Sequence, residues 1–302
     1  MSNNQSDVKM LNSTTTNGDQ LSQNKEIIDG KWFGFSSIQG HRPSMEDFHQ
    51  HLTHLADHHL WKKYSYFSIF DGHSGSGTAH YGSNNLHIYL VHELNRLINH
   101  KENQSDNNKI RRRKFRHAIK KAFIKLDKQL RKIDYDKSGS VCIACLIGPK
   151  QIYLINVGDA RAIIISDNGE VLASTHDHKP DDPKEEERIH EAGGHITQKS
   201  SKDISRVERR LAMTRVLGDF TIDKNVVPPI PDITIYPRKS STGFIILASD
   251  GIWNVMSNEQ VASFVVQRIS TTIKLDKIAS QLLDHFLEKQ SRDNMSVYII
   301  KI

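Results

Sequence analysis

Short apolar runs recur along the chain and predict β-strands. Gly148-Pro149-Lys150 divides one pair of runs, and Asp167-Asn168-Gly169 after another run is a strong hairpin signal. Because parallel strands need long crossovers, such short connections favour antiparallel neighbours. The eight runs are WFGFSSI (32–38), FHQHLTHL (48–55), KYSYFSIF (63–70), SVCIACLI (140–147), QIYLINV (151–157), RAIIIS (161–166), FIILAS (244–249) and SVYIIKI (296–302).

Between these runs, apolar residues recur every three or four positions, which is the period of an amphipathic helix. In one such segment, Asp181 or Asp182 is placed to cap the N-terminus, and Pro183 lies in the first turn. Hairpin strands with separate helices predict the α+β class, with antiparallel sheets covered by helices, and a doubly wound parallel sheet fits the order less well. The expected helices cover residues 78–98, 109–133, 183–192, 258–268 and 277–288.

The domain organisation follows from where the composition changes. Residues 1–29 are rich in Asn, Ser, Thr and Gln and predict a disordered tail. No long linker rich in proline or glycine interrupts the remainder, and no internal repeat is found. We therefore expect one domain over residues 30–302.

The composition excludes several classes of protein. The 302 residues are 37% hydrophobic, but no stretch reaches the roughly 18 apolar residues of a membrane-spanning helix, and the first residues do not resemble a signal peptide. The only cysteines, Cys142 and Cys145, exclude a disulfide framework and favour a reducing compartment. We expect a cytoplasmic protein without membrane association, and the nucleus is a second location to consider.

The formal net charge of +6 is concentrated in the segment 109–133. Its apolar residues are spaced by three and four, so the basic residues form the polar face of a helix. The simplest interpretation is a solvated helix face, and the alternatives are a localisation signal or a docking patch for an anionic partner. Nucleic-acid binding is not favoured, because the helix has few aromatic residues.

Four aspartates lie at the ends of apolar runs: Asp71, Asp159, Asp250 and Asp293. A single aspartate in such a place is most often a turn residue or a helix cap. A charged carboxylate in an apolar setting needs compensation, so four of them suggest a shared cation, although the sequence leaves open whether the four ends meet. Oxygen ligands favour a hard ion, Mg²⁺ or Mn²⁺, over Zn²⁺.

Two further features accompany these aspartates. Gly72 follows Asp71, and its carbonyl could bind a metal because no Cβ blocks the approach, although it could equally be a turn residue. In GHRPSMEDFH, Arg42 is suited to bidentate phosphate binding and lies close to the adjacent Glu46 and Asp47. A surface salt bridge is the alternative interpretation of this trio.

Eight short motifs follow one another along the chain. They are GHRPSMED (40–47), IFDGHSG (69–75), SGS (138–140), NVGDAR (156–161), EAGGHI (191–196), LGD (217–219), ASDGIW (248–253) and DNMS (293–296). Each motif alone is a weak signal, but eight in one order at compatible spacings are specific. The series resembles the metal-dependent protein phosphatase family of type 2C, and the resemblance covers about residues 32–302.

The resemblance implies a four-layer αββα sandwich in which two stacked antiparallel sheets are flanked by helices. It also implies two divalent ions, Mg²⁺ or Mn²⁺, at one end of the sandwich. Asp71 would bridge the two ions, the Gly72 carbonyl would bind one of them, and Asp250 and Asp293 would bind the other.

Three acidic residues complete the implied metal site. Glu46 and Asp47 would act mainly through metal-bound water. Asp159 matches a position associated with a weaker third ion near Asp250. Asn254 stands where the family often has aspartate, which puts the third ion in doubt.

The implied activity is hydrolysis of phosphoserine and phosphothreonine in proteins. A hydroxide held between the two ions would attack phosphorus directly, Arg42 would hold the substrate phosphate, and His73 would protonate the leaving alkoxide. The alternative is an inactive relative that binds phosphoproteins as a regulator, and the presence of all these residues argues against it. Phosphorylated proteins are the expected partners, and the resemblance favours a monomer.

The chain departs from the family pattern at Glu208-Arg209, where the family commonly has Asn-Gly, in a region (197–210) where the family carries a mobile flap. The effect of this charged region on substrate choice is left open. After SGS the chain continues with Val141-Cys142 instead of the usual Thr-Ala, which we interpret as a packing variation.

Overall fold

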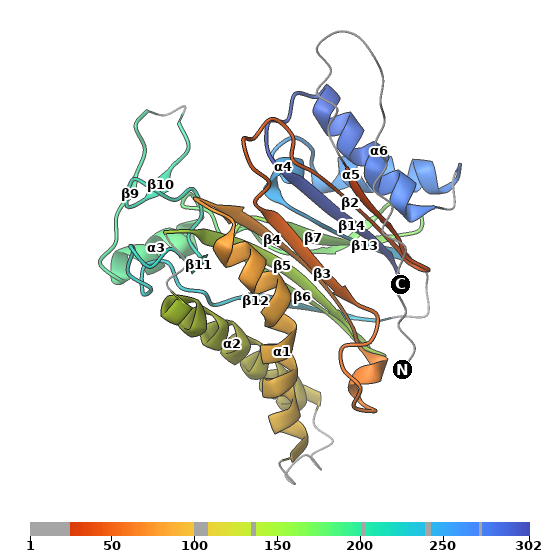
Figure 1. Ribbon diagram of the computed structural model, residues 1–302, viewed down its shortest axis with the longest axis horizontal. Coiled ribbons are helices and arrows are strands. Elements are labelled where there is room, and N and C mark those ends of the chain that lie inside the picture. Colours follow the sequence, from red (N-terminus) through yellow and green to blue (C-terminus); the bar gives the residue numbers. More distant parts are fainter. Residues whose placement is uncertain (1–24, 100–107, 134–136, 201–202, 239–242, 272–273) are drawn as a thin grey trace. The chain divides into compact units, whose positions relative to one another are not determined.

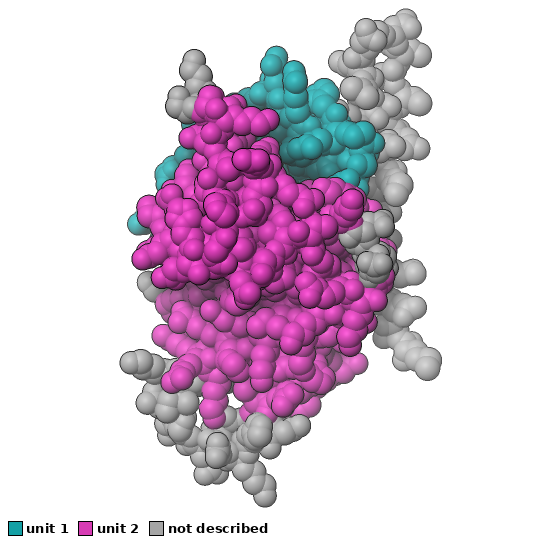
Figure 2. Space-filling model, turned by 90° about the vertical axis from the view of Figure 1, so that its left-hand side faces the viewer, with its two compact units in different colours: residues 1–47, 160–174, 238–302 teal, residues 48–159, 175–237 magenta. Residues whose placement is uncertain are grey.

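The structure is a computed structural model that describes residues 25–99, 108–133, 137–200, 203–238, 243–271 and 274–302 (Figure 1). It divides into two compact units, each assembled from segments that are separate in the sequence (Figure 2). The prediction of a single domain over 30–302 stays a prediction. Unit 1 comprises residues 1–47, 160–174 and 238–302, and unit 2 comprises residues 48–159 and 175–237.

Unit 1 is built on one antiparallel sheet. Its elements are β1 (Glu26–Asp29), β2 (Phe33–Ile38), β7 (Arg161–Ser166), β8 (Val171–Ser174), β13 (Gly243–Ala248), α4 (Asp250–Trp253), α5 (Asn258–Ile269), α6 (Leu275–Glu288) and β14 (Met295–Lys301). The strand order is β1-β2-β14-β13-β7-β8. Helix α6 packs on β2 and β14, and α5 packs on α6.

The core of unit 1 shows why these strands and helices form. Alternate residues of β13 and β14, such as Ile246 and Ile299, join one apolar cluster with Phe264 of α5 and Phe286 of α6. This period of two places one face of the sheet against the helices. Ser257 begins α5 through a capping box, which satisfies backbone N–H groups that the first helical turn leaves without partners.

Unit 2 is built on a second sheet. Its elements are β3 (Asp47–Leu52, whose first residue belongs to unit 1), a 3₁₀ turn (Trp61–Lys63), β4 (Ser65–His73), α1 (Gly77–Asn99), α2 (Asn108–Ile133), β5 (Gly139–Ile147), β6 (Gln151–Val157), α3 (Pro183–Glu191), β9 (Ile196–Thr197), β10 (Arg206–Val207), β11 (Leu217–Gly218) and β12 (Asp232–Pro237). The order is β12-β6-β5-β4-β3, β11 pairs with β5, and β9 pairs with β10. The β12, β6, β5 and β4 pairs are antiparallel.

Helices α1 and α2 cover this sheet, and Figure 1 shows them together below β4 and β5. Cys142 of β5 lies in one buried cluster with Leu90 of α1 and Phe123 of α2. Cys145 is buried as well, so both cysteines are core residues, as predicted. The exposed cations of α2, such as Arg113, lie on the face opposite its buried apolar stripe, which confirms the amphipathic helix.

The eight predicted strands and five predicted helices are all present, and the α+β class is confirmed. The prediction missed β1, the short or weakly patterned strands β8, β9, β10, β11 and β12, and the short helix α4. Two of its other statements are corrected by the structure. Strand β1 lies inside the predicted tail 1–29, because Ile28 is buried and residues 26–29 pair with β2. The remainder of the predicted tail, residues 1–24, lies outside the described residues. Asp71 does not end its strand, because β4 continues through it to His73. None of the described helices is long and apolar enough to cross a membrane.

Candidate active site

Asp47, the first residue of β3, is a buried carboxylate of unit 1. Its side chain is buried, with 5% of the residue exposed. Oδ2 accepts a hydrogen bond from the Ser249 hydroxyl at 2.9 Å, whereas Oδ1 has no partner among the described residues. An uncompensated buried oxygen of this kind is a position that a cation would stabilise.

The electrostatic environment of Asp47 supports the same interpretation. Its pKa is raised to about 7, mainly because the carboxyl is buried. Hydrogen bonds from Ser296 and Ser249 lower the pKa in part, and the negative charges of Asp250 and Asp293 raise it again. Three carboxylates therefore influence one another within unit 1. The charges of Asp250 and Asp293 favour a neutral Asp47 unless a positive charge is present.

Asp250 and Asp293 are held at the edges of regular elements. Asp250 is the first residue of α4, which is separated from β13 by Ser249 alone. Its Oδ2 accepts a hydrogen bond from the Asn254 amide at 3.1 Å. Asp293 lies just before β14, and its Oδ2 pairs with Arg42 Nη2 at 2.7 Å. Arg42, the predicted phosphate-binding residue, thus lies beside a predicted metal ligand.

Hydrogen bonds of Asn294 hold a loop that contains Arg42 and Glu46 next to Asp293. The Asn294 amide donates to the carbonyls of Gln39 and Ser44 at 2.7 and 3.0 Å, and its oxygen accepts the N–H of Glu46 at 2.8 Å. Sequence analysis assigned no role to Asn294, and its place in the DNMS motif was the available signal. The asparagine fixes the distance between the loop and Asp293.

Gly40 lets this loop approach Asp293. Its φ is +64°, and a Cβ at this position would lie 2.2 Å from the Asp293 carbonyl oxygen. A side chain is therefore excluded both by the backbone conformation and by space.

In unit 2, three of the predicted residues form the end of β4. Asp71, Gly72 and His73 are consecutive, and they are opposite Val141, Ser140 and Gly139 of β5. The Ser140 hydroxyl donates to the Asp71 carbonyl at 3.1 Å, and His73 Nε2 lies 2.5 Å from Asp219 Oδ2. The central pair of strands therefore presents the carboxylate, the glycine and the imidazole in a fixed register.

Asp159 is buried and follows Gly158, whose φ is +97°.

Considered by itself, each unit brings its own predicted residues together: Arg42, Glu46, Asp47, Asp250 and Asp293 in unit 1, and Asp71, Gly72 and His73 in unit 2. Within the described part of the chain, no group of three or more His, Cys, Asp or Glu side chains is arranged as a metal site.

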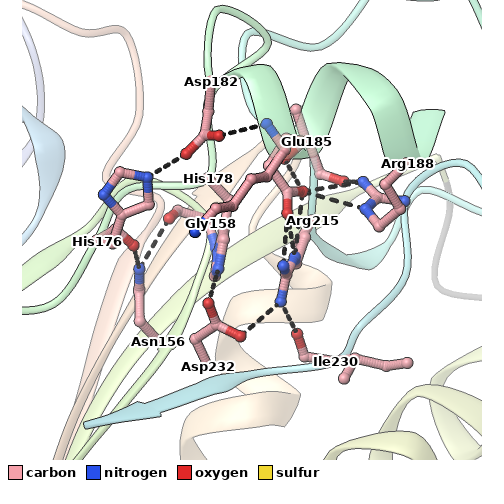
Figure 3. A network of polar contacts seen from close by, with 12 residues as sticks. Asn156, Gly158, His176, His178, Asp182, Glu185, Arg188, Arg215, Ile230 and Asp232 are labelled. Atoms are coloured by element: carbon pink, nitrogen blue, oxygen red, sulfur yellow. Dashed lines mark hydrogen bonds and ion pairs between the residues drawn. The ribbon is translucent and has the colours of Figure 1, made fainter. Parts of the chain in front are cut away.

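A second polar cluster of unit 2, shown in Figure 3, positions the chain that leads to β11. Glu185 of α3 is buried and accepts hydrogen bonds from Thr214, Arg188 and Arg215. Arg215 also donates to Asp232 at 3.0 Å. Burial alone would raise the pKa of Glu185, but the hydrogen bonds from Arg215 and Thr214 outweigh it and lower the pKa to about 2.

Asp232 links this cluster to a buried histidine. His178 Nε2 lies 3.4 Å from Asp232 Oδ2 (Figure 3). The pKa of Asp232 is lowered, chiefly by His178 and also by Arg215, and burial lowers the pKa of His178. The cluster joins α3, β12 and the segment before β11, and it contains no residue of the predicted metal site.

Comparison with known proteins gives consistent results. The model of the family "Protein phosphatase 2C" matches residues 32–295. Protein phosphatase 1B of Bos taurus is 36% identical over 285 residues, which are 90% of this chain and 57% of that protein. Protein phosphatase 1A of Homo sapiens is 35% identical over 286 residues, which are 90% of this chain and 71% of that protein.

The chain thus spans 57% of the length of the bovine relative, and the human Protein phosphatase 1B is covered to the same extent. Among solved structures, a serine-threonine phosphatase 2C from Toxoplasma gondii superposes with a TM-score of 0.74 at 19% identity, covering 98% of both chains. This likeness shows the fold.

Proposed function

Because the chain belongs to the protein phosphatase 2C family, we propose that it is a metal-dependent phosphatase that hydrolyses phosphoserine and phosphothreonine in proteins. One observation carries the proposal. Asp47 buries a carboxylate oxygen that has no partner among the described residues, close to the charges of Asp250 and Asp293. A cluster of this kind is costly in a protein without a bound cation, and hard oxygen ligands select Mg²⁺ or Mn²⁺.

The proposed ligands of two ions are Asp71, the Gly72 carbonyl, Asp250 and Asp293. Glu46 and Asp47 would take part mainly through water. A weaker third ion at Asp159 is the least supported part of the assignment, because the Asn254 amide donates to Asp250 where a further carboxylate would be needed. Bound divalent ions would supply an activated water and would neutralise charge on the phosphoryl group.

Two other residues act on the substrate. Arg42 presents a planar guanidinium that can hold two phosphate oxygens and stabilise their charge during the reaction. It now pairs with Asp293, so binding of a phosphate would exchange one oxyanion partner for another. His73 gives a proton to the serine or threonine oxygen as the P–O bond breaks.

The test is phosphate release from a phosphothreonine peptide by protein stripped with a chelator. We expect turnover on addition of Mn²⁺ or Mg²⁺ and none without it. Asp250→Asn should lower kcat/KM by at least about a hundredfold, since it removes a proposed ligand charge. Asp57→Asn is the matched control, because Asp57 is exposed, and it should leave the rate unchanged.

Two results would reject the proposal. Full activity in the presence of the chelator would exclude a metal-dependent reaction. Absence of turnover with both metals, together with retained binding of the phosphopeptide, would assign the chain to the alternative class of phosphoprotein-binding regulators.

A further inference from the structure

His73 has a partner that the sequence motifs do not reveal. Asp219 follows β11, which pairs with the start of β5, and His73 ends β4, which pairs with the same part of β5. The two side chains meet there, and His73 Nε2 lies 2.5 Å from Asp219 Oδ2. The carboxylate is buried, with 8% of its side chain exposed, whereas 24% of the His73 side chain is exposed.

The backbone around this pair is shaped to hold it. Asp219 has a φ of +47°, a left-handed conformation that is uncommon for residues other than glycine. Its N–H donates to the Ser138 carbonyl at 3.1 Å, and its own carbonyl accepts the N–H of Ile222 at 3.0 Å. The strained residue is therefore fixed on both sides, which directs its carboxylate toward His73.

Gly139 provides the space for the pair. A Cβ at this position would lie 2.0 Å from Asp219 Oδ2 and 2.4 Å from His73 Nε2. Any other residue would push the carboxylate and the imidazole apart. Three separate segments, at residues 73, 139 and 219, thus contribute to one contact.

We propose that Asp219 is a positioning residue that orients His73 for proton donation, an inference that rests on the proposed function. Asp219 accepts the Nε2–H hydrogen bond and so fixes the plane of the ring. Nδ1 forms no hydrogen bond within the described part of the chain, so it is the nitrogen left to donate a proton to the substrate. In the step, the ring begins as an imidazolium that carries a proton on each nitrogen. The Nδ1–H bond breaks and an O–H bond forms on the leaving oxygen, which keeps the electron pair of the breaking P–O bond. The ring is left neutral, with its remaining proton on Nε2 and hydrogen-bonded to Asp219.

A comparison of leaving groups separates this role from a structural one. The p-nitrophenolate ion is stable and departs without a proton, whereas a threonine alkoxide is strongly basic and needs one. A residue that only supports the fold would affect both substrates equally. A residue that positions the proton donor would affect the phosphopeptide selectively, and would do so in kcat and not in KM.

Asp219→Asn is the appropriate variant, because asparagine tolerates positive φ and has nearly the same shape. We expect its kcat on a phosphothreonine peptide to fall at least about tenfold, with p-nitrophenyl phosphate turnover within about threefold of the parent. Asp223→Asn, an exposed change in the turn that follows, should leave both rates unaltered. Equal losses on both substrates, or no loss, would overturn the inference.

His73→Gln distinguishes failure of this inference from failure of the proposed function. If His73 is the proton donor, its loss should show the same selectivity for the phosphopeptide, and the double variant with Asp219→Asn should be no slower than His73→Gln alone. If His73→Gln slows hydrolysis of the phosphopeptide selectively but Asp219→Asn does not, only the role of Asp219 is overturned. No selectivity in His73→Gln removes the proton donor itself.

A spectroscopic measurement on the unsubstituted protein needs neither metal nor variant. Long-range ¹H–¹⁵N correlation spectra assign the protonated nitrogen of a neutral histidine. We expect His73 to carry its proton on Nε2, since Asp219 is an acceptor. Protonation on Nδ1, with an unprotonated Nε2, would contradict the proposed orientation.

Discussion

Replacing Glu185 by glutamine removes a negative charge that pairs with both Arg188 and Arg215 (Figure 3). The glutamine keeps the size of the side chain, so the change is mainly electrostatic. Arg215 retains its ion pair with Asp232, which is half-exposed and compensates only in part. We therefore expect a folded protein of reduced stability.

The magnitude follows from the pKa of Glu185. The pKa is lowered from the ordinary value of 4.5 to about 2, and this difference corresponds to about 3 kcal/mol of stabilisation of the ionised form. The folded-state pKa lies below the unfolded one. The stabilisation is therefore complete above about pH 5 and is lost as the pH falls toward 2.

Urea unfolding followed by tryptophan fluorescence measures this effect, because Trp61 is buried in unit 2. Glu185→Gln should lower the free energy of unfolding by about 3 kcal/mol at pH 7, and the difference from the parent should shrink below pH 4.5. Glu186→Gln, an exposed change on the same helix, should stay within about 0.5 kcal/mol. A loss below about 1 kcal/mol at pH 7, or a difference that does not change with pH, would refute the reasoning.

Two further predictions concern the carboxylates of unit 1. Asp47→Asn should raise the melting temperature in chelator at pH 8 by about 2 to 4 °C, and the gain should be smaller at pH 5. The reason is that the pKa of Asp47 is raised to about 7, so the parent protein loses stability as the pH rises from about 4 to 7 and this carboxyl ionises. A variant with a lower melting temperature than the parent at pH 8 would contradict this. Gly40→Ala should weaken Mn²⁺ binding at least about tenfold in calorimetry, because its Cβ would press on Asp293, whereas Gly193→Ala, at φ +79° with nothing within 4 Å, carries the same backbone strain and should bind normally.

The strands and helices of the core could be predicted because their apolar periodicity is strong. Strand β5 is buried along its whole length, and α6 has a clear apolar face. The missed strands have weaker signals. β12 is an edge strand whose residues are mostly half-buried, β8 alternates between half-buried and exposed residues, and β9, β10 and β11 have two residues each. Their pairing depends on partners far away in the sequence.

Some features of the candidate site could likewise be predicted from the sequence, and others could not. The acidic residues could be found from their positions next to apolar runs and from the order of the motifs. Contacts between distant residues could not be predicted from the sequence. Asp219 is 146 positions away from His73, and Asn294 is 255 positions away from Gln39. Sequence analysis could not find the Asp47 oxygen that has no partner among the described residues, because its burial depends on the folded chain.

The most direct test of the central claim is the number of Mn²⁺ ions that bind to one chain, measured by calorimetry on protein stripped with a chelator. The account predicts two tightly bound ions for the parent and weaker or fewer ions for Asp250→Asn. Phosphopeptide hydrolysis should appear over the same range of Mn²⁺ concentration as the binding. Absence of Mn²⁺ binding in a protein that still releases phosphate would contradict the account.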